Sequence, residues 1–322
     1  MPVVGRTTGV VALSLDGKPC GSAKSVAGGD ISAPVIEEQA GPTGFVLKHL
    51  GPPVYEELTL QVGLGMGPAF YDWIAATWTR NFARKSGSIA ASDVNLQVKT
   101  SREFTNALIT ETTIPALDGA SKDAALLTVK LAPELISSAA PSGALPAPPA
   151  DKKWLAANFR VELDGLDCTK VSKIDSFTVT VETVAAPIGE DRQPIAESAV
   201  IHFPNLAITL AESSAQTWID WFADFVVKGN NDESKEKGGA IVFLAPDMKT
   251  ELGRVTLHNV GICALRHPVL GPTAAQIPRL TAELYCERME LQVGAGSPVV
   301  PPQPVIVVPH PRPPIEPGRV VG

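Results

Sequence analysis

Residues 15–20 of the chain read LDGKPC, and residues 163–168 read LDGLDC, so four of six positions repeat at an offset of 148. The same offset relates further positions, pairing Tyr55 with Phe203, Leu58 with Leu206 and Leu60 with Ile208. A repeat near this length has the size of a typical domain, and a chain of 322 residues can hold two of them.

Two later segments extend the repeat. FYDWI at 70–74 corresponds to WIDWF at 218–222 and keeps the central Asp-Trp pair in register. LTVKLAPEL at 127–135 resembles LTAELYCER at 280–288, but the offset there is 153, so the second copy holds about five additional residues. Matched segments in the same order predict an internal duplication.

The repeated segments indicate a mainly β protein. GVVALSLDG at 9–17 and NFRVELDGL at 158–166 alternate between apolar and polar residues and stop at Asp-Gly, which predicts a strand followed by a turn. The positions that mark the repeat are Asp16, Gly17 and Trp73 in the first copy and Asp164, Gly165 and Trp221 in the second. We expect two tandem antiparallel β-barrel or sandwich domains, each with one flanking α-helix.

The tryptophans identify that helix in each copy. Pro68 suits a first helical turn, and apolar residues follow it at spacings of three and four up to Trp78. In the second copy, Ser213 or Ser214 is expected to cap a helix that ends at Gly229.

Composition shifts divide the chain into four parts. We expect a first repeat at 1–138, a Pro/Ala-rich linker at 139–153, a second repeat at 154–293 and a proline-rich tail at 294–322. The tail favours polyproline II, and it is either a solvated extension or a segment that docks on an aromatic groove of a partner.

Charge and hydropathy exclude several classes of protein. The net charge is −7 and no basic run occurs, which argues against a protein that grips nucleic acid. No apolar run of 18 residues is present, so no membrane association is expected. The N-terminus lacks the layout of a signal peptide, which predicts synthesis in the cytoplasm. The four cysteines include no C-x-x-C and are expected to be reduced.

No motif predicts an enzyme. Gly63, Gly65 and Gly67 lie where a dinucleotide-binding turn would be, but the equivalent turn of the second copy, LAESSAQTW, has no glycine. His258, Cys263 and His267, with Cys286 as a fourth candidate, lack the tight ligand pairs of zinc sites. We predict no catalytic residue, cofactor or metal ligand, and leave open whether Cys263 and His267 bind a metal.

The repeated segments resemble the tail tube family of T4-type contractile phages, which is related in outline to the inner-tube proteins of type VI secretion. The resemblance rests on the strand–LDG–strand start, the aromatic-Asp-Trp helix and the closing LTxxLxxE strand. The second copy fits more closely, through residues 159–182, the WIDWF segment and LTAELYCERMEL at 280–291.

The resemblance implies a structural protein. Members of that family form small antiparallel barrels that assemble into six-membered rings, and the rings stack into a hollow tube. Three duplicated chains would fill six positions, which implies a trimer with pseudo-sixfold symmetry, as a tube ring or as a baseplate hub. The implied partners are further copies of the chain and other tail or baseplate proteins, with DNA or protein cargo as transient contents of the lumen. The implied location is a virion or phage-like particle assembled in the bacterial cytoplasm.

Barrel edges invite strand addition by a neighbour, so we expect the opening strands to form contacts between barrels. The residues expected there are Val11, Leu13 and Leu15 in the first copy and Phe159, Val161 and Leu163 in the second. A proline at Val161 or Leu163 is predicted to abolish ring formation. Two other hypotheses remain open, a soluble two-domain β binding module that recruits a partner through its proline-rich tail, and a metal- or nucleotide-dependent enzyme.

Overall fold

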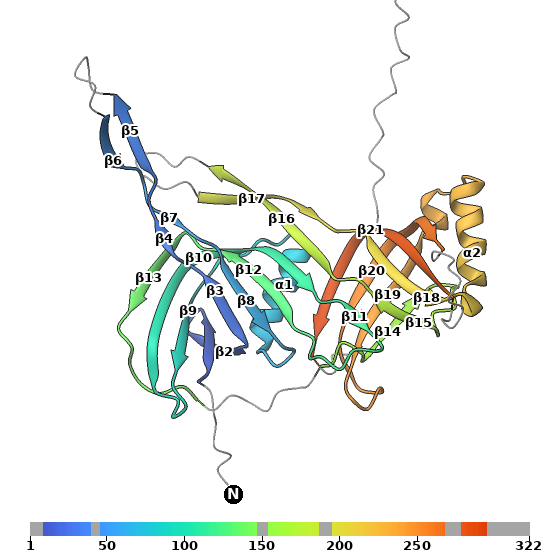
Figure 1. Cartoon of the computed structure of the whole chain (residues 1–322), viewed down its shortest axis with the longest axis horizontal. Coiled ribbons are helices and arrows are strands. Elements are labelled where there is room, and N and C mark those ends of the chain that lie inside the picture. The colour runs from blue at the N-terminus through green and yellow to red at the C-terminus, as the bar shows by residue number, and fades with distance from the viewer. Residues whose placement is uncertain (1–8, 40–45, 147–153, 187–194, 268–277, 295–322) are drawn as a thin grey trace, which may run out of the picture.

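The computed structural model describes residues 9–39, 46–146, 154–186, 195–267 and 278–294. We refer to residues 9–146 as the first half and to residues 154–294 as the second half. Figure 1 shows an elongated molecule dominated by antiparallel strands, which confirms the predicted fold class. Among the described residues, no helix is long and apolar enough to cross a membrane.

The first half is a closed sheet. Its strands follow the order β2-β1-β9-β10-β12-β8-β3. They are β1 (Val11–Leu15), β2 (Lys18–Ala23), β3 (Ser25–Gly28), β8 (Leu58–Val62), β9 (Lys85–Ser92), β10 (Val98–Ile114) and β12 (Leu127–Ala132), with β13 (Leu135–Ala139) added on β10. Only Lys24 separates β2 from β3, and this bent segment pairs with β1 at one end and with β8 at the other. The sheet therefore closes on itself.

The second half is a curved sheet of the same topology. Its strands follow the order β11-β15-β18-β21-β20-β19-β14. They are β11 (Leu117–Asp118), β14 (Phe159–Leu163), β15 (Val171–Ile174), β18 (Leu206–Ala211), β19 (Lys237–Leu244), β20 (Glu251–Arg266) and β21 (Arg279–Val293). β11 comes from the first half of the chain, so the two halves interleave.

Each half also has a hairpin inserted before one of its strands, which is β8 in the first half and β18 in the second. In the first half it consists of β4 (Ile31–Ser32) with β7 (Val54–Tyr55) and β5 (Val35–Gln39) with β6 (Val46–Leu50). In the second half it consists of β16 (Phe177–Ala186) and β17 (Ile195–His202). The first hairpin projects from one end of the molecule, and the second lies along the first half (Figure 1).

The first helix forms as the sequence predicts, and the second begins differently. α1 spans Pro68–Trp78 with proline in its first turn. In the second half, a 3₁₀ turn at Glu212–Ser214 precedes α2 (Gln216–Phe222), which continues as a π-helical segment, Ala223–Val227. The predicted serine cap is wrong, because both serines lie inside the 3₁₀ turn and Ala215 takes the N-cap position without a side-chain hydrogen bond. Gly229 follows with a φ of 77°, as expected of a residue after a helix end.

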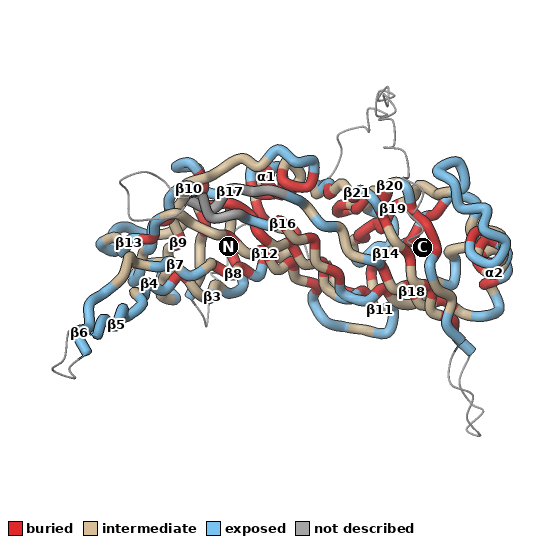
Figure 2. The backbone as a smooth tube through the Cα atoms, turned by 90° about the horizontal axis from the view of Figure 1, so that it is seen from above, coloured by how far each residue is buried: buried red, intermediate tan, exposed pale blue. Residues whose placement is uncertain are grey.

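Alternating side chains of several strands form the core, and β19 adds a continuously buried run from Ala240 to Leu244. Leu58, Leu60 and Val62 of β8 are at most 1% exposed, and the corresponding residues of β18, namely Leu206, Ile208 and Leu210, are fully buried. Figure 2 shows buried stretches in both halves, and most of these residues belong to one connected cluster. Burying these side chains provides the main stabilisation, at about 25 cal/mol per Å² of apolar surface.

The repeat markers have structural roles. Asp16 and Gly17 both have positive φ angles, 50° and 76°, and form the tight turn between β1 and β2. Trp73 is buried and its Nε1 donates a hydrogen bond of 2.7 Å to the Ala83 carbonyl. Gly165 also has a positive φ, and Trp221 is buried with Lys237 Nζ 5.3 Å from its ring centroid.

The predicted tail lies almost wholly, and the predicted linker partly, outside the described residues. Residues 147–153 of the predicted linker and residues 295–322 of the predicted tail lie outside the described residues. The described start of the linker runs beside the loop at Leu96, where Ala144 forms a bridge with Gln97 and the Leu145 amide donates to the Leu96 carbonyl.

Candidate assembly interface

The two halves share a β-ladder. Where β9 ends, β16 of the second half takes over the free edge of β10 at Glu111–Ile114. Ile114 lies opposite Phe177, and both side chains are buried. Next to them, the hydroxyls of Thr113 and Thr178 lie 2.8 Å apart. Main-chain hydrogen bonds and cross-strand side-chain pairs therefore join the halves.

In a second ladder, the first half contributes a strand to the sheet of the second half. β11 of the first half pairs with β15 of the second, with Leu117 opposite Ile174. Both of these side chains are fully buried. Each half thus contributes a strand to the sheet of the other. We call this set of contacts, together with the helix contact described next, the internal junction.

Helix α1 is the third part of the internal junction. It packs more closely against β21 of the second half than against any strand of its own half. Its buried residues recur at spacings of three and four and form one broad face, and they are Phe70, Tyr71, Trp73, Ile74, Thr77 and Trp78. Trp78 meets Phe203 of the second half edge to face, with ring centroids 6.3 Å apart. Such a pair adds about 0.5–1.5 kcal/mol to the stabilisation that burial provides.

One ion pair beside the internal junction lies within the first half, between β10 and β12. Glu111 accepts a hydrogen bond of 2.8 Å from Lys130, and this bond raises the pKa of the lysine above its usual value. Both side chains are about one third exposed, so solvent screens the pair and it contributes about 1 kcal/mol or less. The contacts described between the two halves are main-chain pairing, one hydroxyl pair and apolar packing.

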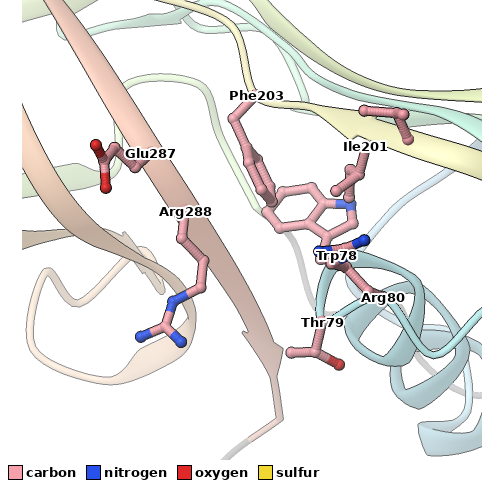
Figure 3. Close-up of a pocket in the computed structure, with 8 residues that line it drawn as sticks. Trp78, Thr79, Arg80, Ile201, Phe203, Glu287 and Arg288 are labelled. Atoms are coloured by element: carbon pink, nitrogen blue, oxygen red, sulfur yellow. The ribbon is translucent and has the colours of Figure 1, made fainter. Parts of the chain in front are cut away.

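A cleft of about 400 Å³ opens beside the helix contact (Figure 3). Its lining comes from the end of α1, from β17 and the residues after it, and from β21, and comprises Trp78, Thr79, Arg80, Val200, Ile201, Phe203, Glu287 and Arg288. Trp78 Nε1 is buried and has no hydrogen-bond partner among the described residues. Burial raises the pKa of the Glu287 carboxyl. The lining holds no histidine, cysteine or serine that could act as a nucleophile or metal ligand.

The opening strands lie within the sheets of the two halves, and their role in assembly stays a prediction. β1 pairs with β2 on one edge and β9 on the other, so it has no edge left for a neighbour. Leu13 and Leu15 are core residues, and Val11 packs against the same core. β14 pairs with β19 on one edge and has no strand on its other edge among the described residues. Its Val161 and Leu163 are buried, with Phe159 half-buried. An assembly role for β14 stays a prediction.

The strands that do join the halves were missed. β10, β11, β15 and β16 meet at the internal junction, and none of their residues was singled out in the sequence. One signal was present. The offset of 148 holds from Val26/Ile174 to Leu60/Ile208, so both copies carry a hairpin insertion of equal length.

The glycine turn before α1 is filled by the protein itself. The Tyr71 hydroxyl donates to the Gly63 carbonyl at 2.7 Å and accepts from the Met66 amide at 3.1 Å. The Gly67 amide donates to the Cys20 carbonyl at 2.6 Å. Burial raises the pKa of the Tyr71 hydroxyl, which therefore stays protonated. These contacts leave two of the turn's amides occupied rather than directed at a phosphate.

The candidate metal ligands do not form a cluster among the described residues. Within the described ranges, no group of three or more His, Cys, Asp and Glu side chains is placed to hold a metal ion. Cys286 is buried and directs its thiol to the main-chain oxygens of His258 and Arg288. Burial raises its pKa to about 11, which disfavours the thiolate that a metal would need. Cys263 is exposed, and its thiol donates to the Glu283 carbonyl.

Comparison with known proteins bears on these features. Residues 10–136, which include the whole closed sheet of the first half, match the model of the T4-like virus tail tube protein gp19 family. This confirms the resemblance to the tail tube family. The match spans 127 of the 322 residues and lies on the copy that the sequence motifs fit less closely. No curated protein matches the chain.

Three solved structures are similar to part of the chain. The first is the sheath–tube complex of the PVC extracellular contractile injection system, at 25% identity and a TM-score of 0.36, covering 44% of this chain and 92% of the other. The second is the tube-terminating cap of the anti-feeding prophage, at 26% identity and a TM-score of 0.35, covering 43% and 93%. The third is Hcp1 from Flavobacterium johnsoniae, at 13% identity and a TM-score of 0.25, covering 42% and 96%. The tail tube family match supports a structural role in a tube.

Proposed function

We propose that the chain is a ring-forming subunit of the tail tube, or of the hub that adjoins it, in a phage or phage-like contractile injection system. In this proposal, residues 1–138 and 154–293 are two tube repeats that arose by duplication and are joined by a linker at 139–153. Three chains would form one ring with six tube-like positions. The protein acts by assembly and not by catalysis.

The observation that supports this proposal most is the internal junction. Two halves of matching strand order stand side by side and exchange strands, which is how neighbouring subunits of a ring would be joined. A covalent pair of this kind replaces one of every two contacts in a six-membered ring. Heterologous contacts that repeat with a constant rotation close into a ring.

The proposal also names partners. Rings would stack on one another and on other tail or baseplate proteins, in a particle assembled in the bacterial cytoplasm. DNA or protein would pass through the lumen without binding tightly, and the net charge of −7 favours the passage of polyanionic DNA.

Light scattering of the purified protein, with negative-stain images of the same sample, tests the proposal. We expect a mass of three times 33.8 kDa, or rings and tubes with a central hole. A monomer that forms no ring at any concentration, and none when mixed with preformed tubes, would contradict the proposal and favour a soluble binding module.

A further inference from the structure

At the internal junction, one half contributes a hairpin and the other half contributes the free edge of a strand. We call the hairpin the donor and the strand edge the acceptor. The donor is the hairpin of the second half, and the acceptor is the edge of β10 beyond the end of β9. The first half has a donor hairpin too, and the second half has an acceptor edge on β20, where β19 ends opposite Val260. Within the described residues, neither of these has a partner from another sheet.

The acceptor edges correspond residue by residue. β10 shifts register against β12 between Ile109 and Glu111, and β20 shifts in the same way against β21 between Ile262 and Ala264. After the shift, Thr113 pairs with Thr128 of the closing strand, and Arg266 pairs with the equivalent Thr281. At an offset of 153, Arg266 of β20 is therefore equivalent to Thr113 of β10, and Leu265 is equivalent to Thr112.

The donor hairpins correspond as well. β3 and β15 meet β8 and β18 at the same offset of 148. Ser32 pairs with Val54, as Thr180 pairs with His202. Asp30 is therefore equivalent to Thr178, and Ile31 is equivalent to Val179.

We propose that the hairpin of one chain adds to the β20 edge of a second copy of this chain, with the register of the internal junction. Asp30–Ser32 then pairs antiparallel with Ala264–Arg266 of the neighbour. Ile31 lies opposite Leu265, and Asp30 lies opposite Arg266. This inference rests on the proposed ring assembly and specifies its contact.

The exposed surface of the hairpin fits such a partner. Ile31 is 55% exposed, whereas Val179 at the corresponding place is 1% exposed. Its further exposed apolar side chains are Val35, Ile36, Val46, Leu47, Leu50 and Val54. A two-stranded hairpin is marginally stable by itself in water, so one that exposes this much apolar surface needs a partner.

Charge complementarity supports the register. Thr113 and Thr178 share a hydrogen bond at the internal junction, and an aspartate and an arginine replace them at the free ends. Asp30 now lies 3.6 Å from Arg102, and Arg266 lies 3.1 Å from Glu283, both as exposed pairs on the surface. Cross-strand pairs of opposite charge contribute about 0.2–1 kcal/mol, so the new pair favours this register over its alternatives.

Helix α2 adds a second contact with the same neighbour. The positions of Tyr71, Ile74 and Trp78, which are all buried, correspond at offset 148 to Ile219, Phe222 and Val226. These three are half-buried or exposed and have helical spacing, so they form one apolar face. By analogy with Trp78 on Phe203, Val226 would face Tyr55 of the neighbouring chain. Figure 1 shows the first hairpin and α2 at opposite ends of the molecule, as a head-to-tail contact requires.

Disulfide trapping tests the register. The exposed Cys263 is first replaced by threonine, the residue at the corresponding bulge of the first half, Thr110. In that background, Ile31→Cys and Leu265→Cys are combined. Opposite residues of an antiparallel pair have Cα atoms about 4.5–5.5 Å apart, within the range of a disulfide. Two controls accompany it: Thr112→Cys with Val179→Cys, which face each other within one chain, and Val35→Cys with Leu265→Cys, which is off register.

After mild oxidation, the proposal predicts bands of two and three linked chains on a non-reducing gel for the tested pair. The internal control should form its disulfide within the 33.8 kDa chain, and the off-register pair should stay unlinked. If light scattering shows rings and the internal control links but the tested pair does not, the proposed register is wrong and the proposed function stands. If the protein forms no oligomer at all, both are contradicted. Equal linking of the off-register pair also overturns the register.

Discussion

The hairpins at 31–55 and 177–202 occupy equivalent positions in the two halves but have different neighbours. The second lies on β10, where its Phe177 and Val179 are at most 4% exposed. The first has no strand beside it among the described residues, and its Ile31 and Val54 are more than half exposed. At equivalent positions, Val179 is thus buried where a neighbouring half is present, and Ile31 is exposed where none is present. The difference indicates that the free hairpin is half of an interface.

Removing the free hairpin has the largest expected effect. Replacing residues 33–53 with Asn-Gly leaves the Ser32–Val54 pair closed by a two-residue turn. We expect assembly to be lost while the free energy of unfolding changes by about 0.5 kcal/mol or less, because the deleted strands contribute no core residue. Light scattering and urea unfolding measure the two quantities. Retained rings would contradict the role of the hairpin.

Trp78, at the end of α1, corresponds at the offset of 148 to Val226, in the π-helical segment that follows α2. Trp78→Ala removes a buried side chain and is expected to lower the free energy of unfolding by about 3–5 kcal/mol. Val226→Ala, at a residue 40% exposed, is expected to change it by about 0.5 kcal/mol or less and to weaken assembly. Urea unfolding of both variants at a concentration where the chain is monomeric checks the contrast. A large loss for Val226→Ala would show that α2 is already covered within the chain.

Reversing the two charges of the proposed contact has a smaller effect. Asp30→Lys and Arg266→Glu are each expected to weaken assembly a few-fold, since a cross-strand ion pair contributes about 0.2–1 kcal/mol. The double variant should recover most of the loss, and high salt should reduce all three differences. Sedimentation at several concentrations measures the association. Additive losses in the double variant would mean that the two residues do not face each other.

The smallest expected difference in stability is between substitutions in the turns after β1 and β14. Lys85 Nζ donates to the Asp16 carboxylate at 2.8 Å and holds the pKa of that carboxyl below its usual value. Lys237 donates instead to the main-chain oxygen of Asp164, also at 2.8 Å. Asp16→Asn is therefore expected to cost more than Asp164→Asn at pH 7, though less than about 1 kcal/mol because Asp16 is half exposed.

The sign of the pH dependence follows from the lowered pKa. The Asp16 contribution is present above the pKa of the unfolded carboxyl, about 3.9, and is lost as the pH falls through the lower folded pKa. The difference in stability between the wild type and Asp16→Asn should therefore close below about pH 4. Thermal unfolding across this range measures it, and a gap that persists at pH 2 would exclude the ion pair as its cause.

Much of the fold could be predicted from local pattern. Period-two segments such as Leu58–Val62 became strands, the Asp16-Gly17 turn has the positive φ angles that Asp-Gly favours, and α1 begins at Pro68. The start of α2 could not be predicted, since a serine can cap a helix or join a 3₁₀ turn, and tertiary packing decides between them.

The interface could not be predicted from the same patterns. Glu111–Ile114 has the alternation of any half-buried strand, and only the end of β9 leaves its edge open to another half. Barrel edges favour strand addition by a neighbour, which predicts contacts through the opening strands, but β1 has both edges paired within its own sheet. Repetition in sequence identifies what each unit needs for folding, whereas assembly depends on which edges the fold leaves free.

Electron cryo-microscopy of the assembled protein, reconstructed without imposed sixfold symmetry, tests the central claim most directly. We expect six junctions in each ring, alternating between those within a chain and those between chains, with Asp30 opposite Arg266 in the latter. A ring in which the hairpin at 31–55 leaves the β20 edge of its neighbour empty and reaches instead to the ring above or below would contradict the claim.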